Sequence, residues 1–551
     1  DSFETINLLE GLVEKDWFTF LYLGLAYEDL NNHSKAISNY LRSLNRNPNS
    51  IALYRLGKIY YKKNNFRKAI FFFSRLLKFD PSIRLANYYL GEALAKIGDF
   101  KDAYNYLSKS TNFYPQNLKL RSDFTKVKNK LGEDFFKELK IALEKARKKV
   151  LLLFYQKEKE IPLVRIGIAK NLNKVSFKCG GDFLFSDSKK KFKGKKDIIY
   201  TLVYKKDKVL LFSDNEILEN FICPLRLESK GYPFYIFELN YGEGNFWTKT
   251  IDRAYRGDFE ILSKNNGLVL VNILSIEEYL YGVIPAEIPP SSDLEALKAQ
   301  AVASRTHLLK NLGRHKEEGF DLCADFHCQV YQGFSIENET TNLAVKETRG
   351  EVLIYNDKLV DIFYHANCGG CLRCCAFGEN NFLVNKFDSF EEKLKNKYNS
   401  AYGEEIWFTE KPKTFCASDK SSFRWQRIYD SEDFNLIFSF PIEDLKEVKF
   451  IKKDSCFHYN EVEIITLKEK KNIKGDLNIR NYFDKLRSSA FKFEIKFSTD
   501  KKPQIIFFWG GGFGHASGLC QEGSINMAKM GYNYREILKY YYPKFRLKKI
   551  Y

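Results

Sequence analysis

Apolar and small residues recur with a single period along the first 118 residues of the chain. Three segments of equal length, which begin at Tyr22, Arg55 and Tyr89, align without a gap. Each reads as a helix, a polar turn and a second helix that ends at a proline. The aligned small residues and prolines are Gly24, Gly57 and Gly91; Ala36, Ala69 and Ala103; and Pro48, Pro81 and Pro115. One such hairpin cannot bury its apolar face alone, so the pattern predicts that successive hairpins stack.

This period, with small residues where paired helices touch, resembles the tetratricopeptide repeat. The resemblance implies an N-terminal α-solenoid of about three repeats over residues 1–118, in which residues 1–14 are the tail of an earlier helix. The concave surface of such an array usually binds a protein or peptide partner, and the alternative is a purely structural spacer. Residues 119–150 are rich in charge and predict a capping or linker helix.

The hydrophobic pattern changes near Leu151, where short runs rich in β-branched residues replace the helical period. The runs LVRIGIA, IIYTLVY, YIFEL and LVLVNIL each predict a strand, so residues 151–551 are expected to form a mixed α/β, strand-rich domain. Within it, Ser292 and Glu295 are spaced as a capping box at the start of an alanine-rich helix. Glu287 precedes this helix among three prolines, so we expect it on a short, stiff loop.

The composition is that of a folded protein, since 44% of the 551 residues are hydrophobic and 16% are aromatic. The formal net charge of +18 indicates either a polyanionic partner or a lysine-rich composition bias. No basic stripe is interleaved with aromatic residues, so no nucleic-acid partner is expected. The longest uncharged apolar runs are far shorter than the ~20 residues that span a bilayer, and no signal peptide is visible. We expect any leader or membrane anchor to lie ahead of Asp1 and outside this chain.

Four candidate metal ligands lie close together in the sequence: His315, Cys323, His327 and Cys328. Two imidazoles and two thiols are a set that zinc binds in tetrahedral geometry. Because a set of four protein ligands leaves no open position, the expected cofactor is a structural zinc ion. The alternative is that the two cysteines are free or disulfide-bonded.

A second group of cysteines lies in the segment CGGCLRCC, which contains Cys368, Cys371, Cys374 and Cys375. These residues are compatible with disulfides to Cys416 or Cys520, with a second metal site, or with reactive thiols. Their spacing alone leaves the three alternatives open.

The segment YLYGVIPAEIPPSSDLEALKAQAVASRTH resembles the core motif of the family of sporulation stage II protein D and the amidase enhancers (SpoIID/LytB). Blocks similar to that family follow in the same order, namely DLCADFHCQVYQG, AVKETRGEVLIYNDKLVDIFYHANCGG, LRSSAFKFEI and GGGFGHASGLCQEGSINMAKMGYNYREILKYYYP. The resemblance extends over about residues 160–547 and does not include the repeats. It implies a SpoIID-like fold for the second part of the chain.

The resemblance also implies an extracytoplasmic lytic transglycosylase that acts on the glycan strands of peptidoglycan. Such enzymes cut the β-1,4 bond between N-acetylmuramic acid and N-acetylglucosamine and leave a 1,6-anhydro sugar. Glu287 falls on the family's catalytic glutamate. A glycoside hydrolase needs two carboxyl groups, whereas in a lytic enzyme the sugar's own C6 hydroxyl attacks, so one carboxyl group suffices. The apolar surroundings of Glu287 predict a raised pKa.

Other candidate site residues follow from the same resemblance. The candidates for glycan binding are Tyr281, Gln300, Arg305, His515, Ser517 and Gln521. The alternative for Arg305 is an ion pair inside the fold, and for Tyr281 it is packing. The family usually has Gly-His-Gly where this chain has Gly514, His515 and Ala516, which leaves the contacts of that block open. The four histidines and cysteines between residues 315 and 328 are similar to the zinc ligands of some family members.

The leading hypothesis is therefore a repeat array that docks a protein partner, followed by a peptidoglycan lytic transglycosylase. One alternative is a non-catalytic glycan-binding protein that activates an amidase, and another is a cell-wall scaffold. No organic cofactor is expected. Because the domain family is wider than sporulation, the resemblance does not assign the chain to that process.

Overall fold

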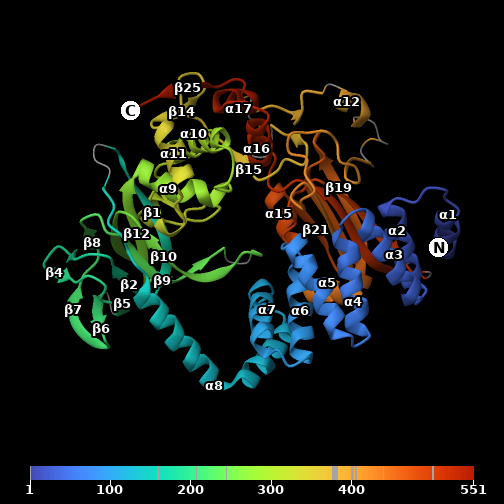
Figure 1. Ribbon diagram of the computed structural model, residues 1–551, viewed down its shortest axis with the longest axis horizontal. Coiled ribbons are helices and arrows are strands. Elements are labelled where there is room, and N and C mark those ends of the chain that lie inside the picture. The colour runs from blue at the N-terminus through green and yellow to red at the C-terminus, as the bar shows by residue number, and fades with distance from the viewer. Residues whose placement is uncertain are drawn as a thin grey trace.

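The computed structural model describes residues 2–157, 161–205, 208–242, 245–374, 382–391, 393–398, 403, 406–438, 440–498, 500 and 502–551. Its N-terminal part is a stack of helical hairpins, drawn in blue in Figure 1. After helix α1 (Ser2–Glu10), the paired helices are α2 (Trp17–Asp29) with α3 (His33–Arg46), α4 (Ser50–Lys62) with α5 (Phe66–Phe79), and α6 (Arg84–Lys96) with α7 (Phe100–Phe113). The predicted α-solenoid is confirmed.

Glycines at the contact between paired helices explain the period of the sequence. A Cβ atom on Gly24 would lie 2.5 Å from the ring of Tyr40, and one on Gly57 would lie 2.6 Å from the ring of Phe73. Both rings are fully buried. Only a residue without a side chain lets the two helices of a hairpin approach this closely.

Helix α8 (Leu118–Lys149) leads from the array to the strand-rich part of the chain (Figure 1). It is interrupted at Gly132, whose φ of 73° and ψ of 169° are not helical. At its far end Arg147 pairs with Asp252 at 2.8 Å, which fixes the helix to strand β10 (Lys249–Tyr255). The charged helix expected over residues 119–150 is therefore present.

Two sheets begin the strand-rich part and share one hydrophobic core. Their strand orders are β13-β1-β12-β11-β8-β3-β4 and β10-β9-β2-β5-β6-β7. The other strands of the first sheet are β1 (Leu163–Leu172), β3 (Phe183–Ser186), β4 (Lys191–Gly194), β8 (Leu225–Ser229), β11 (Asp258–Lys264), β12 (Gly267–Ser275) and β13 (Leu322–Cys323). Those of the second are β2 (Lys174–Cys179), β5 (Tyr200–Lys205), β6 (Lys208–Ser213), β7 (Glu216–Phe221) and β9 (Phe234–Tyr241). Strand β8 alternates buried and exposed positions, whereas β12 is buried along almost its whole length and also contacts helix α9 (Ile276–Glu287).

A layer of helices follows, made of α9 (Ile276–Glu287), α10 (Leu294–Lys310), α11 (Glu339–Glu347), α16 (Gln521–Lys529) and α17 (Tyr534–Tyr541). The capping box predicted for α10 is wrong, because its N-cap is Asp293 and no side chain caps it. Glu295 instead pairs with Lys298 at 2.8 Å and accepts the N–H of Tyr534. A tertiary contact has therefore replaced the local one. The capping box of this region belongs to α9, where Ser275 and Glu278 form it.

Short strand pairs tie distant segments to this layer. Strand β15 (Tyr364–His365) runs parallel to β24 (Leu519–Cys520), and β14 (Glu351–Ile354) runs antiparallel to β25 (Arg546–Lys549). Strand β16 (Cys371–Leu372) pairs with β17 (Lys386–Phe387). The β15–β24 pair matters most for function, because it brings the chain near residue 364 beside the start of α16.

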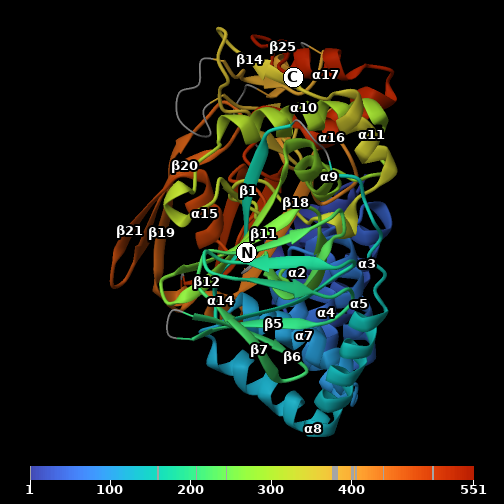
Figure 2. The same cartoon turned by 90° about the vertical axis from the view of Figure 1, so that its left-hand side faces the viewer.

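Residues 424–511 form two further three-stranded sheets, which lie against the repeat array (Figures 1 and 2). Their orders are β18-β23-β22 and β19-β20-β21. The strands are β18 (Arg424–Asp430), β19 (Leu445–Lys453), β20 (Tyr459–Thr466), β21 (Lys470–Lys474), β22 (Phe491–Phe497) and β23 (Pro503–Gly511), with helices α14 (Ser431–Ile437) and α15 (Asp476–Tyr482). Buried residues of the array and of this region belong to one hydrophobic cluster, so the two pack as a unit.

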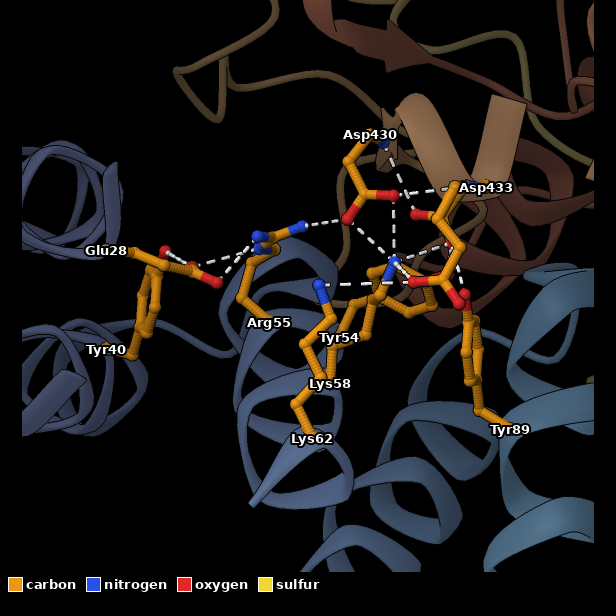
Figure 3. A network of polar contacts seen from close by, with 10 residues as sticks. Glu28, Tyr40, Tyr54, Arg55, Lys58, Lys62, Tyr89, Asp430 and Asp433 are labelled. Atoms are coloured by element: carbon orange, nitrogen blue, oxygen red, sulfur yellow. Dashed lines mark hydrogen bonds and ion pairs between the residues drawn. The ribbon is translucent and has the colours of Figure 1, made fainter. Parts of the chain in front are cut away.

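A buried charge network joins helix α4 of the array to the start of α14 (Figure 3). Lys58 Nζ lies 2.7 Å from Asp430 Oδ2 and 2.8 Å from Asp433 Oδ1. Arg55 lies between Asp430, at 2.8 Å, and Glu28 of α2, at 2.6 Å. Two tyrosine hydroxyls also donate to Asp433, those of Tyr54 and Tyr89. Lys58 and Asp433 are buried, so each charge depends on its partner across the contact.

A second buried network surrounds Asp80, in the turn between α5 and α6. Its carboxylate lies 2.8 Å from Arg427 and 2.8 Å from Arg487. It also accepts the hydroxyl of Ser82. Asp80 is fully buried, and although burial alone would raise its pKa, the two guanidinium groups hold that pKa well below its usual range. One acid of the array thus neutralises two arginines of the 424–511 region.

Apolar contacts complete the interface around Trp509 of β23. Its ring centroid lies 5.1 Å from that of Phe18 and 6.3 Å from that of Tyr22, both on α2. Trp509 is 1% exposed, so its ring is buried in this interface. The first helices of the three repeats therefore contact residues of their own chain. A partner from another chain stays a prediction, and it would have to bind outside this face.

Candidate active site

Glu287 is the last residue of helix α9, and its side chain is partly buried. The expectation of a loop position is wrong because the helix continues through Pro285 to Glu287. The chain leaves the helix at Ile288 with extended backbone geometry, ahead of Pro289. The carboxyl group is therefore held by a seated helix instead of by a stiff loop.

Three neutral donors hold the carboxyl group of Glu287. The backbone N–H of Val330 donates to Oε1 at 2.8 Å. The side chains of Tyr364 and Gln521 also hydrogen-bond to the carboxyl group. Burial raises the pKa of Glu287 to about 7, and these three donors lower it by less than burial raises it. The raised pKa predicted from the apolar surroundings agrees with this geometry, and it places the group between acid and base at neutral pH.

Gln521 is the predicted site residue that reaches Glu287. It starts helix α16 directly after the β15–β24 pair. Its Nε2 atom lies 3.4 Å from Gln300 Oε1, and Gln300 Nε2 donates to Ser304 Oγ at 3.0 Å. Gln300 is fully buried, so the prediction of a glycan contact is wrong for it. Gln300 instead accepts a hydrogen bond from Gln521 and so helps to position that side chain.

Three more predicted glycan contacts are wrong because their side chains are buried. Arg305 is fully buried and forms two hydrogen bonds of 2.8 Å with the carboxylate of Glu277. The alternative of an ion pair inside the fold is therefore the observed one. Tyr281 is 4% exposed and packs in the core of the two sheets. Ser517 is fully buried, and its carbonyl oxygen lies 3.1 Å from Nδ1 of His365.

His515 is partly buried in the glycine-rich loop before α16. Its Nδ1 atom accepts the N–H of Ser517 at 3.1 Å, and its ring lies 5.3 Å from that of His365. Burial, together with His365, holds the pKa of His515 well below its usual value. The imidazole is therefore neutral at physiological pH and offers hydrogen bonds rather than charge.

The four candidate metal ligands between residues 315 and 328 come together in space, with their ligand atoms within 4.8 Å of one another. The Sγ atom of Cys328 lies 3.3 Å from His315 Nε2 and 3.6 Å from His327 Nδ1. The Sγ atom of Cys323 lies 3.8 Å from His327 Nδ1. These separations suit the edges of a zinc tetrahedron. The second nitrogen of His315 bonds to Glu318 at 2.7 Å, the outer contact typical of a metal-ligating histidine.

This first cluster is continuous with the segment that holds Glu287. Cys328 is followed by Gln329, whose Nε2 donates to the hydroxyl of Tyr364 at 3.0 Å. Val330 comes next and donates its N–H to Glu287. An ion bound by the cluster would therefore fix two of the three groups that position the carboxyl group.

A cavity of about 400 Å³ opens beside the first cluster. Its lining includes Tyr241, Arg253, Asp325 and His327. Tyr241 is close enough to Glu287 for the two to interact electrostatically, and its hydroxyl accepts from Gln332. The cavity is thus lined by a residue that interacts with Glu287 and has the mixed apolar and polar walls of a ligand site.

The cysteines of the segment CGGCLRCC separate in the structure. Cys371 forms a disulfide with Cys456, a partner that the sequence did not indicate. Cys368 lies with Cys416 and Cys520 in a buried group. The backbone N–H of Cys374 donates to Asn385. Cys375 lies outside the described residues.

Within the described part of the chain, every helix is too short or too polar to cross a membrane.

Comparison with protein families agrees with both halves of the sequence prediction. Residues 264–355 match the family of the Stage II sporulation protein, which places Glu287 and the first cluster inside the matched range. Residues 19–50 and 50–83 match tetratricopeptide repeats. Residues 377–518 match a domain of unknown function, DUF8618, within the range where the sequence suggested one continuous domain.

Three curated relatives are similar over about half of the chain. An uncharacterised protein of Brachyspira hyodysenteriae is 28% identical over 52% of this chain and 70% of its own length. The amidase enhancer of Bacillus subtilis is 27% identical over 48% of this chain and 39% of its own length. The stage II sporulation protein D of Bacillus subtilis is 25% identical over 49% of this chain and 74% of its own length. Residues that match tetratricopeptide repeats thus lie ahead of a strand-rich part in which residues 264–355 match the family of the Stage II sporulation protein.

Sequence analysis missed two of the groups that hold Glu287, namely the backbone of Val330 and the side chain of Tyr364. A backbone donor has no signature in the sequence. Tyr364 stands beside His365 in a block similar to the SpoIID family, and that position was its only signal.

Proposed function

We propose that this chain is a peptidoglycan lytic transglycosylase that cleaves the bond between N-acetylmuramic acid and N-acetylglucosamine. The observation that carries the proposal is the single carboxyl group of Glu287, which has a pKa raised to about 7. Among the described residues, the groups that shift this pKa are Val330, Tyr364 and Gln521, and none of them is a carboxylate. Asp325 lines the neighbouring cavity but does not shift this pKa, so Glu287 alone has the character of a proton donor near neutral pH, which suits a reaction that needs one carboxyl group.

The chemistry follows from the two protonation states of Glu287. The protonated group gives its proton to the glycosidic oxygen as the bond to the anomeric carbon breaks. The C6 hydroxyl of the muramic acid residue attacks that carbon and forms the 1,6-anhydro ring. The carboxylate left on Glu287 takes the hydroxyl proton, so the enzyme returns to its starting state. Val330, Tyr364 and Gln521 keep the carboxyl group oriented through both transfers.

The first cluster is proposed to hold a structural zinc ion through His315, Cys323, His327 and Cys328. The donor set and its separations suit zinc. Bound there, the ion would fix the geometry of the segment that ends in Val330. With four protein ligands it has no part in the proton transfers.

An extracytoplasmic location is part of this proposal, because peptidoglycan lies outside the cytoplasm. The disulfide between Cys371 and Cys456 supports it, since disulfides persist mainly in oxidising compartments. The proposed partners are glycan strands, which would enter the cavity beside Tyr241.

A non-catalytic role as an amidase activator is the second candidate, and the similarity to an amidase enhancer favours it. The two roles separate in one experiment. Intact and amidase-stripped peptidoglycan are incubated with the protein, and the products are identified by mass spectrometry. Anhydro-muramyl products support the transglycosylase. Stimulation of an added amidase without such products supports the activator, and tethering alone would leave a scaffold.

The pH dependence of cleavage is a direct test of the acid role. Because Glu287 must start protonated and its pKa is about 7, kcat/KM should be level below that pH. Above it the rate should fall about tenfold per pH unit, as the protonated fraction falls. The check is a pH profile on amidase-stripped glycan. A rate that rises with pH would mean that Glu287 acts first as a base.

Replacing Tyr364 by Phe removes one donor to the Glu287 carboxylate. Loss of that hydrogen bond disfavours the ionised form, so the pKa of Glu287 rises and the falling limb of the profile moves upward by about one pH unit. The matched control is Tyr331→Phe, which removes a buried hydroxyl that donates to Asn272 instead. A limb that does not move in Tyr364→Phe would show that this hydroxyl does not act on the carboxyl group.

A further inference from the structure

A second group of possible ligands is buried next to the residues that hold Glu287. The Sγ atoms of Cys368, Cys416 and Cys520 and a carboxylate oxygen of Asp388 all lie within 4.8 Å of one another. All four residues are at most 3% exposed. They come from four separate segments of the chain, so folding alone brings them together.

The separations within this second cluster suit a bound ion. Cys368 Sγ lies 3.3 Å from Cys416 Sγ and 3.4 Å from Asp388 Oδ2. Zinc bonds of ~2.3 Å to sulfur and ~2.0 Å to oxygen give tetrahedral edges of about 3.8 Å and about 3.5 Å. One ion at the centre therefore needs only small shifts of the side chains.

Asp388 argues against a simple disulfide between Cys368 and Cys416. A disulfide would leave the carboxylate of Asp388 fully buried beside uncharged sulfur atoms. Lys386 interacts electrostatically with this carboxylate, but among the described residues no lysine or arginine forms an ion pair with it. A buried carboxylate is ordinarily paired with a cation or bound to a metal, and a divalent ion among the three thiolates supplies that charge.

Contacts around the second cluster orient its ligands. The hydroxyl of Tyr541 donates to the other oxygen of Asp388 at 3.1 Å. The backbone N–H of Cys368 donates to the sulfur of Cys520 at 3.3 Å. Outer donors of this kind fix the direction of metal ligands and stabilise thiolates.

Three thiolates and one carboxylate around a divalent ion carry an excess negative charge, and two cations lie near it. Arg424 and Lys386 both interact electrostatically with cysteines of the second cluster. The guanidinium of Arg424 is fixed by the carbonyl oxygens of Glu410 and Gly369. Cations held in this way lower the cost of burying a negatively charged metal site.

We propose that Cys368, Asp388, Cys416 and Cys520 bind a second, structural zinc ion. A sulfur-rich tetrahedral set selects zinc among the common divalent ions, and four protein ligands close the site to substrate. Cys368 and Cys520 flank the region that matches the domain of unknown function, whereas Asp388 and Cys416 lie inside it. The ion therefore fastens that region to the β15–β24 pair.

The second zinc site lies where it can brace the two side chains that hydrogen-bond to Glu287. Cys520 directly precedes Gln521, and Cys368 follows Tyr364 by four residues. Both side-chain donors to Glu287 thus leave from the segments that the ion joins. This bracing role rests on the proposed function, whereas the metal site itself does not.

The test is the zinc content of the full chain, purified without chelator and measured by plasma mass spectrometry. Cys416→Ser should hold about one zinc ion fewer per chain than the wild type. The matched control is Cys179→Ser, which changes a buried cysteine outside both clusters and should leave the content unchanged. Cys323→Ser removes a ligand of the first cluster, and its remaining zinc should be lost on adding Cys416→Ser. Equal zinc in wild type and Cys416→Ser would overturn the proposal.

A second measurement leaves all four ligands of the second cluster unchanged. Cobalt replaces zinc in Cys323→Ser, so that the second cluster is the one loaded, and the absorption spectrum is recorded. Strong thiolate-to-cobalt bands with tetrahedral ligand-field bands support the site. Peptide mapping of the unreduced wild type that shows a Cys368–Cys416 disulfide would overturn it. Neither readout requires cleavage, so a protein inactive on glycan that contains the second ion would contradict the proposed function alone.

Discussion

Glu287→Gln is expected to remove the anhydro-muramyl products that the wild type releases from peptidoglycan. The amide cannot give a proton to the leaving oxygen or accept one from the C6 hydroxyl, so both transfers are lost. General acid–base catalysis by one positioned group is worth roughly 10²–10⁴-fold, and a loss of about 10³-fold is expected here. The measurement is the rate of anhydro-product formation by mass spectrometry on amidase-stripped glycan.

Whether Glu287→Gln is folded can be checked by comparing its melting temperature with that of the wild type. The pKa of Glu287 is about 7 in the folded protein, above its ordinary value of 4.5. Its carboxyl group therefore favours folding most at pH below 4.5, and that contribution is lost as pH rises through 7. At pH 8 the neutral glutamine avoids a buried charge, so Glu287→Gln should melt at a higher temperature than the wild type. An inactive variant that melts lower would not identify the acid.

Glu295→Gln is the matched control, because Glu295 pairs with Lys298 on α10 and lies outside the group around Glu287. It should keep the wild-type rate within about twofold, as surface substitutions usually change little. Reducing-end products from the wild type would instead indicate hydrolysis and would require a second carboxyl group.

Asp80→Asn is expected to destabilise the whole chain by about 3–5 kcal/mol, because it removes one partner of a buried ion network. Arg427 and Arg487 are each at most 5% exposed, and both lie 2.8 Å from Asp80. Without the carboxylate two buried guanidinium groups lose their shared counter-charge. The measurement is the urea unfolding midpoint, followed by tryptophan fluorescence, to which Trp509 at the interface contributes, and by far-UV circular dichroism.

Asp134→Asn is the control for this substitution. Asp134 lies on α8 with its side chain 91% exposed, and it pairs with Lys137 at the surface. Its unfolding midpoint should equal that of the wild type, because exposed ion pairs contribute little. If Asp80→Asn were as stable as this control, the charged contact between the array and residues 424–511 would not hold the two together.

The fold could be predicted from the sequence wherever one short pattern determines the structure. Gly24 and Gly57 each face a buried ring of their own hairpin, at a contact fixed by a period of about 34 residues. The strands after Leu151 could likewise be predicted, because each is encoded by one short run of β-branched residues. The first metal cluster was visible too, because its four ligands lie within one short segment.

The errors at the site came from contacts that local patterns do not encode. Arg305 was a candidate for glycan binding because it matched the family's helix motif, yet Glu277 of the neighbouring helix pairs with it inside the core. Glu295 was assigned to the capping box of α10, but its carboxylate instead accepts the backbone N–H of Tyr534. Pro285 suggested a loop, although it is accommodated inside the last turn of α9. In each case a tertiary partner decided the outcome.

The packing of the array against a later part of its own chain could not be predicted, for the same reason. Lys58 and Asp433 are separated by 375 positions, and neither stands in a motif that names the other. Charged residues on the concave side of a repeat array are usually taken as contacts for a separate protein partner. Here Lys58 instead contacts Asp430 and Asp433 of the same chain.

That arrangement has a consequence for the order in which the polypeptide matures. Domains generally form from the N-terminus as the chain is synthesised, so the array can fold long before residues 424–511 exist. During that interval Arg55, Lys58 and Asp80 face water and lack their later partners. Ribosome-bound or translocating intermediates would thus expose charged side chains that are buried in the mature protein.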